Sequence, residues 1–180
     1  FGTNEIASKS EHFYELYFEF ERDIPMVPWM IYIYQSFAVL IIVTYFSIKS
    51  PQKIKAYSIS FMSSCGIAAV FFILFPTELG FSRTENIEGH EFMYNLLHMI
   101  DKPHNLAPSL HITYSALGAY VLSSEIKSKW LKGMIWLWFL LICSSIVLVH
   151  QHHLFDIFSG IVLALIVIYN IYDKLERITS

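Results

Sequence analysis

Five long apolar windows determine what kind of fold this chain can adopt. Each contains about 20 residues, which is the length that an α-helix needs to cross the hydrocarbon core of a bilayer. Only 15% of the 180 residues are charged, whereas a soluble domain has about 25%. We therefore expect an all-α membrane helix bundle that forms a single domain over 1–180. The five predicted transmembrane helices cover residues 24–47, 55–75, 109–126, 130–149 and 153–172.

The third window differs from the others because polar residues interrupt it. Its first half contains Ser109, His111, Thr113 and Ser115. Small and hydroxyl residues favour close packing between helices over contact with lipid. We expect this helix to lie inside the bundle.

Two further segments predict amphipathic helices on the membrane surface. The first, over residues 1–23, has apolar residues at helical spacing, namely Phe13, Leu16, Tyr17 and Phe20. The second, over residues 85–100, has one apolar side, formed by Phe92, Leu96 and Met99.

The loops alternate in charge, which predicts an orientation. Eight of the 12 Lys and Arg residues gather at one end of the predicted bundle, namely Lys49, Lys53, Lys55, Lys127, Lys129, Lys132, Lys174 and Arg177. Basic loops remain in the cytoplasm, so we expect the loop 76–108 on the outer side. The N-terminal segment would also lie outside. Because the chain begins at Phe1 rather than Met, we expect a sixth span upstream.

Other features of the composition narrow the class of protein. No basic run is interleaved with aromatic residues, which argues against nucleic-acid binding, and a net charge of -3 indicates little about partners. Cys65 and Cys143 lie in apolar windows and are expected to be packing residues. The sequence leaves the oligomeric state open.

A polar motif stands where the third window begins, and it reads Asp101-Lys102-Pro103-His104-Asn105-Leu106-Ala107-Pro108-Ser109-Leu110-His111. Ionisable groups are costly near hydrocarbon, so their presence there indicates a function. Pro108, Ser109 and Asn105 are typical of a helix start. The backbone N–H groups and the positive dipole of that start favour binding of an anion beside His111.

A second polar motif stands where the last window begins, and it reads His150-Gln151-His152-His153-Leu154-Phe155-Asp156. Asp156 follows His152 by four positions, so the two share one face of a helix. The carboxylate can accept the ring N–H of His152, which leaves the other nitrogen as a nucleophile. An anion held between this nucleophile and an acidic His111 is suited to phosphoryl transfer. Arg83 and Lys102 are cations near the outer face that could bind phosphate.

At these residues the chain resembles the type 2 phosphatidic acid phosphatase superfamily, over about 76–165. That family has Pro-Ser-Gly-His at the head of one span and, two spans later, Ser-Arg, five residues, His, three residues, Asp. Pro108-Ser109-Leu110-His111 resembles the first motif, while Ser145, His152 and Asp156 match the second in spacing. The wider strings, with Pro-Ser-Leu-His and Gln-His-His-x-x-Asp, are similar to a bacterial branch of the family.

The resemblance implies a role for each site residue. His152 would be the phosphohistidine nucleophile, Asp156 would orient it, and His111 would protonate the leaving group. Phosphate oxygens would be held by Ser109, with Arg83, Lys102 and Asn105 as further candidates. His150 and His153 are possible site residues. The resemblance implies no metal and no other cofactor.

The chain departs from the family pattern at three places. Ile146 stands where the second motif has its Arg, and Leu110 replaces the Gly of the first. The opening Lys, six residues, Arg-Pro of the family is not present, because Pro76 occupies the place of the Lys and Thr84 follows Arg83. The family usually has six spans, which again suggests a missing upstream helix.

The predicted function is that of a metal-independent lipid-phosphate phosphatase in a bacterial inner membrane, with its site on the extracytoplasmic side. Its partners would be a lipid phosphate monoester or diphosphate and the bilayer. A phosphotransferase that passes the headgroup to an alcohol is an alternative, since Pro-Ser-Leu-His is also similar to inositol phosphotransferases of sphingolipid synthesis. A second alternative is a metal- or haem-binding membrane protein, with ligands His111, His150, His152 and His153.

Overall fold

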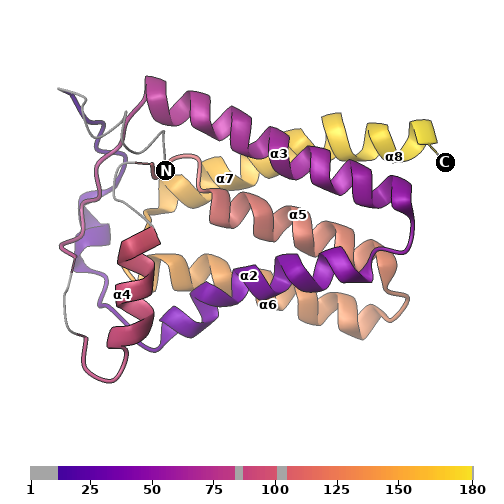
Figure 1. Cartoon of the computed structure of the whole chain (residues 1–180). Helices are drawn as coiled ribbons and strands as arrows, with labels where there is room; N and C mark the ends of the chain where they lie inside the picture. Colours follow the sequence, from indigo (N-terminus) through magenta and orange to yellow (C-terminus); the bar gives the residue numbers. More distant parts are fainter. Residues whose placement is uncertain (1–11, 84–86, 101–104, 180) are drawn as a thin grey trace.

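Long helices form where the apolar windows predict them (Figure 1). The computed structural model describes residues 12–83, 87–100 and 105–179. The helices are α2 (Met30–Ser47), α3 (Pro51–Leu74), α4 (Glu91–Ile100), α5 (Leu110–Glu125), α6 (Lys129–Leu148) and α7 (Leu154–Val167). A π-helical turn, η2 (Ile168–Tyr172), continues α7 into α8 (Asp173–Thr179).

Four of these stretches are long and apolar enough to cross a membrane: α2, α3, α6 and the continuous segment Leu154–Arg177. The fifth predicted span corresponds to α5, which has 16 residues and does not meet that length. The structure therefore supports a helical membrane protein with four candidate spans, and the predicted number of five is not confirmed.

Helix α5 lies at the centre of the bundle, as its hydroxyl-rich sequence predicts (Figure 1). It packs against α2, α3, α6 and α7. Thr113 Oγ1 donates to the carbonyl of Gly160 on α7 at 3.0 Å. A Cβ atom at Gly160 would lie 2.7 Å from the carbonyl oxygen of Ser109, so only glycine allows the starts of α5 and α7 to approach this closely.

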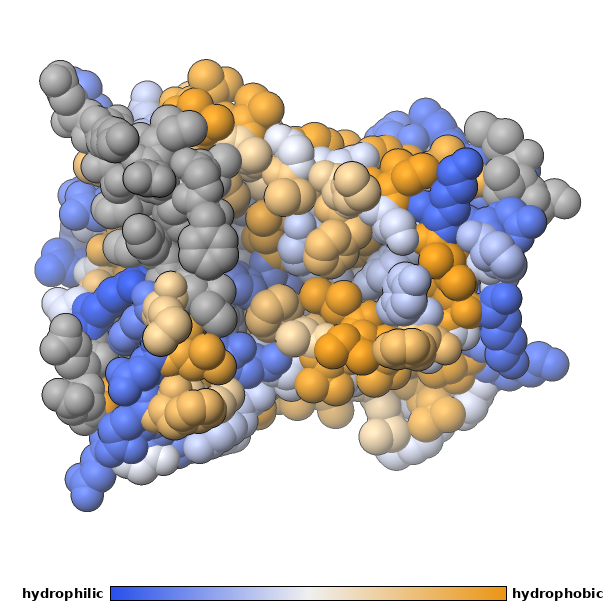
Figure 2. Space-filling view, in the orientation of Figure 1, coloured by the Kyte–Doolittle hydropathy of each residue, from blue (hydrophilic) through white to orange (hydrophobic). Residues whose placement is uncertain are grey.

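The surface divides into an apolar middle and two polar ends (Figure 2). The end that contains the loops 48–50 and 126–128 together with α8 is called the lysine end, after Lys53, which pairs with Glu125 and Glu176. The other end contains the starts of α5 and α7 and is called the histidine end. Exposed large apolar side chains between the two ends, such as Phe46, Met62 and Leu140, suit contact with lipid.

Residues 12–29 form an N-terminal strap across the histidine end. Tyr14 pairs through its backbone with Pro76 and Glu78, and Val27 N–H donates to the carbonyl of Leu148 at 2.8 Å. The only regular element of the strap is a 3-10 turn, Glu19–Asp23. The amphipathic helix predicted over residues 1–23 is therefore wrong over 12–23, because these residues use their backbone groups to bind distant loops. Residues 1–11 lie outside the described residues.

Helix α4 lies across the same end, roughly perpendicular to the bundle helices (Figure 1). The helix predicted over 85–100 is present from Glu91 onward, and residues 85–86 lie outside the described part. Tyr94 and Leu97 form its buried side. The predicted apolar side faces away from the bundle, since Phe92 and Met99 are exposed.

Candidate active site

A tight turn between α6 and α7 carries the second motif. The main chain reverses at His150, which has a positive φ of 56°, a conformation that histidine adopts more readily than most residues. The Ile146 carbonyl, in the last turns of α6, accepts the backbone N–H groups of Gln151 and His152 at 3.2 and 3.3 Å. This turn brings His152 and His153 to the start of α7.

His152 and Asp156 form the pair that their spacing predicts. His152 Nδ1 lies 3.2 Å from Asp156 Oδ2, and both side chains are buried. Because a carboxylate only accepts, Nδ1 carries a proton, and the neutral form of the ring has its lone pair on Nε2. Among the described residues, Nε2 has no hydrogen-bond partner although it is buried. A buried polar atom without a hydrogen bond lowers the stability of the folded state by about 1–3 kcal/mol. The presence of such an atom at His152 therefore calls for a functional explanation.

The start of α5 faces this pair. Ser109 caps the helix, with its Oγ accepting the N–H of Ile112 at 3.5 Å. The Ser109 N–H donates to the main-chain oxygen of Asp156 at 3.2 Å, which ties the two helix starts together. His111 lies in the first turn of α5, and its ring centroid is 5.6 Å from that of His152. A single phosphoryl group could contact both imidazoles.

Two residues of α2 surround His111, and the sequence reasoning missed both. Tyr34 Oη lies 2.9 Å from His111 Nε2. The ring of Phe37 meets the imidazole edge-on, with centroids 4.7 Å apart. Both residues lie in an apolar window, and nothing in their local sequence distinguishes them from packing residues.

The other two histidines of the turn use their ring nitrogens to hold it in place. His150 Nε2 donates to the carbonyl of Ile24 at 2.9 Å. His153 Nδ1 lies 3.3 Å from Glu21 Oε2, and its Nε2 accepts the Gly80 N–H at 3.0 Å. Burial lowers the pKa of His153, and the Gly80 contact requires its neutral form. These contacts favour a structural role for both rings.

The structure describes one of the two cations that are predicted to bind phosphate. Arg83 is half-buried in a small cavity of about 10 Å³ that Tyr94, His98, His150 and Gln151 also line. This cavity borders the turn just before His152 but does not include His111 or His152. Asn105 is half-buried ahead of Ser109, and Lys102 lies outside the described residues. The side chain of Ile146 is fully buried in the core, so this position contributes no cation.

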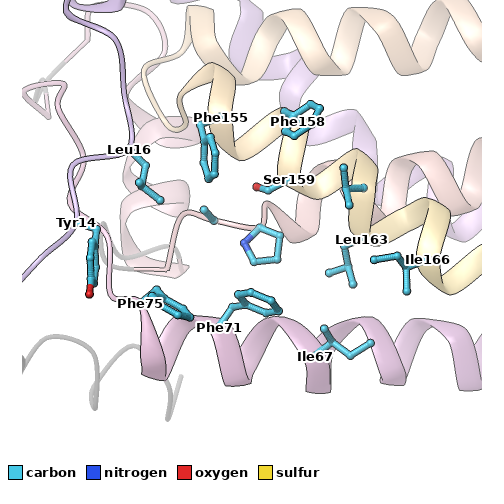
Figure 3. Close-up of a pocket in the computed structure, with 13 residues that line it drawn as sticks. Tyr14, Leu16, Ile67, Phe71, Phe75, Phe155, Phe158, Ser159, Leu163 and Ile166 are labelled. Atoms are coloured by element: carbon cyan, nitrogen blue, oxygen red, sulfur yellow. The ribbon is translucent and has the colours of Figure 1, made fainter.

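A larger apolar cavity of about 390 Å³ lies between α3 and α7 (Figure 3). Phe71 on α3 and Phe75, just after its end, face Phe155 on α7 across it. Ala107 and Pro108, which lead into the cap of α5, also line this cavity. The apolar cavity therefore adjoins the helix start that faces His152.

The histidines do not form a metal site in the part of the chain that the structure describes. No group of three or more His, Cys, Asp or Glu side chains is arranged there to hold a metal ion. The metal- or haem-binding alternative therefore has no ligand set among these residues.

Comparison with known proteins identifies the family of the chain. No curated protein and no solved structure matches the chain. A family model described as the PAP2 superfamily matches residues 10–170, which includes the strap, both motifs, three candidate spans and most of the fourth. The chain therefore belongs to the PAP2 superfamily, the family of type 2 phosphatidic acid phosphatases.

Proposed function

We propose that this protein is a lipid-phosphate phosphatase that works through a phosphohistidine at His152. One observation carries the proposal. The buried Nε2 of His152 has no partner among the described residues, while Asp156 holds the opposite nitrogen and the ring of His111 lies 5.6 Å from that of His152. Membership of the PAP2 superfamily supports phosphatase chemistry on phosphate esters in a membrane.

In the first step, His152 Nε2 attacks the phosphorus atom of the lipid phosphate. An N–P bond forms while the P–O bond to the lipid breaks, and His111 passes a proton to the leaving oxygen. The imidazole becomes cationic as it is phosphorylated. Asp156 stabilises that charge because its carboxylate accepts the Nδ1–H.

In the second step, His111 has lost its proton and acts as a base toward water. The water oxygen attacks phosphorus, the N–P bond breaks, and free phosphate leaves with His152 neutral again. Tyr34 holds His111 Nε2 at 2.9 Å and keeps this ring directed into the site between turnovers.

The orientation follows from the charges at the two ends. Lys49, Lys53 and Lys127 lie at the lysine end, and basic loops face the cytoplasm. The histidine end would then face the extracytoplasmic side. A lipid in the outer leaflet would present its phosphate there.

The apolar cavity between α3 and α7 suits the hydrocarbon chain of that lipid. It adjoins Pro108 at the start of α5 and extends along α7 to Ile166, deeper in the bundle (Figure 3). A chain in this cavity would hold its headgroup beside Ser109. Long-chain lipid phosphates should therefore be better substrates than short soluble esters.

Phosphate release in the presence of EDTA tests the function. The purified protein in detergent is offered phosphatidic acid, phosphatidylglycerophosphate, undecaprenyl diphosphate and a lipid A phosphate. We expect release from at least one of these lipids, with loss of release in His152→Ala and His111→Ala. Activity that EDTA abolishes, or activity in both variants equal to that of the wild type, would contradict the proposal. Transfer to an added alcohol without phosphate release would identify the phosphotransferase alternative.

Two matched variants test the site for the lipid chain. Val162 lines the cavity that faces α3, whereas Leu165 lies on the other side of α7 and lines a different cavity with Trp136. Val162→Trp should raise KM for the long-chain lipid and leave the hydrolysis of p-nitrophenyl phosphate unchanged. Leu165→Trp should change neither. Equal effects of the two variants would rule out this cavity as the chain site.

A further inference from the structure

Glu21 is a carboxylate with no exposed surface, and it comes from the N-terminal strap rather than from either motif. Its Oε1 accepts the N–H of Phe18 at 2.9 Å, which closes the 3-10 turn. Its Oε2 lies 2.8 Å from the Leu154 N–H and 3.3 Å from His153 Nδ1. A buried carboxylate is costly unless donors surround it, so these contacts explain why Glu21 can be buried at this place.

Glu21 and Asp156 together fix three consecutive residues. Asp156 Oδ2 accepts from His152 Nδ1 and from the His153 N–H, at 3.2 and 2.8 Å. Glu21 accepts from the side chain of His153 and from the next N–H, that of Leu154. The peptide groups on both sides of His153 are therefore anchored by different carboxylates. The direction of the neighbouring His152 ring depends on this short stretch of backbone.

His153 connects the strap to the nucleophile. Its Nε2 accepts the Gly80 N–H at 3.0 Å, so Nδ1 carries the proton that faces Glu21. The rings of Tyr17 and Phe81 stack on the imidazole, at centroid distances of 4.8 and 4.5 Å. A Cβ at Gly80 would lie 2.7 Å from the Tyr17 ring, so glycine is needed for this packing. His153 is thus held on its edges and on its faces.

We propose that Glu21 is a positioning residue for the His152 nucleophile, acting through His153 and the first peptide of α7. The inference rests on the proposed phosphatase function. Without Glu21, Leu154 N–H and His153 Nδ1–H lose their acceptor, and the turn can rotate about its remaining contacts. The ring of His152 would then spend less time with Nε2 directed at the phosphorus.

Kinetics of Glu21→Ala test the role, with Glu19→Ala as the matched control. Glu19 belongs to the same 3-10 turn, but its side chain is exposed and contacts Arg22 at 3.7 Å. We expect Glu21→Ala to lower kcat by about 10–100-fold with little change in KM, as removal of a supporting partner does. Glu21→Gln keeps one accepting oxygen and should fall between Glu21→Ala and the wild type.

Imidazole ¹⁵N NMR spectra of the protein in micelles give a readout that needs no activity. In the wild type, His152 and His153 should both be Nδ1–H tautomers. Glu21→Ala should give mixed tautomers at His152 as well as at His153, while Glu19→Ala should give the wild-type spectrum. Glu21→Gln supplies the same comparison if the alanine variant does not fold.

An unchanged His152 spectrum together with a normal kcat per folded molecule would overturn the proposal and leave Glu21 a purely structural role. Failure of the proposed function gives a different result. In that case the wild type releases no phosphate, and the NMR comparison still reports whether Glu21 controls the tautomer of His152.

Discussion

Carboxylates are paired at both ends of the bundle, but their partners differ. At the lysine end, Lys53 Nζ lies 2.7 Å from Glu125 and 3.1 Å from Glu176. At the histidine end, Asp156 and Glu21 face imidazoles at 3.2 and 3.3 Å. Each end also ties separate helices together, so the difference lies in the chemistry of the partner.

An ammonium group keeps its proton throughout the physiological range, whereas an imidazole exchanges its proton near neutrality. Lys53 is therefore suited to holding α3, α5 and α8 in place. The histidine end can move protons as well as hold helices. A cluster of paired charges therefore indicates reactivity when its members can change protonation state and leave a nucleophilic atom available.

Of the variants that distinguish the two ends, a replacement of His152 should have the largest effect on kcat. In His152→Ala, we expect kcat to fall by about 10⁴–10⁶-fold, because the attacking atom is gone. The melting temperature should change little, since the variant also removes a buried nitrogen without a partner. His90→Ala removes a half-buried ring on the same side of the molecule, which contacts Tyr32 rather than either motif, and serves as the control. Appreciable phosphate release by His152→Ala would refute the assignment.

Asp156→Asn should have the next largest effect. The amide removes the negative charge that stabilises the cationic imidazole, and it disturbs the tautomer, so we expect a loss of about 10²–10⁴-fold in kcat. Imidazole ¹⁵N shifts would report the tautomer of His152 directly. A variant with normal kcat would mean that this carboxylate only caps α7.

At the lysine end, Lys53→Met should reduce stability and spare catalysis. Glu125 and Glu176 would lose their counter-ion, and we expect a cost of about 1–2 kcal/mol in unfolding free energy. Lys53→Arg should restore most of it. A fall in kcat as large as that of Asp156→Asn would remove the distinction between the ends.

The smallest predicted effect is a dependence of folding stability on pH, which arises from His153 at the histidine end. Burial lowers the pKa of His153, so the unfolded chain takes up a proton at that ring before the folded chain does. Stability should therefore fall as the pH drops below about 6.5, by at most about 1.4 kcal/mol per pH unit for one proton. In His153→Gln, thermal unfolding between pH 7 and pH 5.5 should show a weaker dependence, whereas an unchanged slope would assign the effect to another group.

The sequence predicts contacts that lie within one turn of a helix. The pairing of His152 with Asp156 follows from their spacing of four residues, and the cap formed by Ser109 follows from its place before an apolar window. The central position of α5 follows from its small and hydroxyl residues. In each case the partner lies nearby in the sequence, or the composition of the segment predicts its burial.

The contacts that complete the candidate site join residues far apart in the chain. Tyr34 and His111 are separated by 77 positions, and Glu21 and His153 by 132. No local pattern indicates such a partner. Apolar spacing in the strap favoured a surface helix, but the actual constraint is the set of backbone bonds that Tyr14 makes with residues 76–78.

Rapid chemical quenching shows whether His152 is phosphorylated during turnover. The protein is mixed with a ³²P-labelled lipid phosphate, stopped in base within the first turnover, and digested for mass spectrometry. We expect a base-stable, acid-labile phosphoryl group on the peptide that contains His152. The same group should be missing in His152→Ala and present in His90→Ala. Label on His111 or on a serine, or turnover with no phosphoprotein, would contradict this expectation.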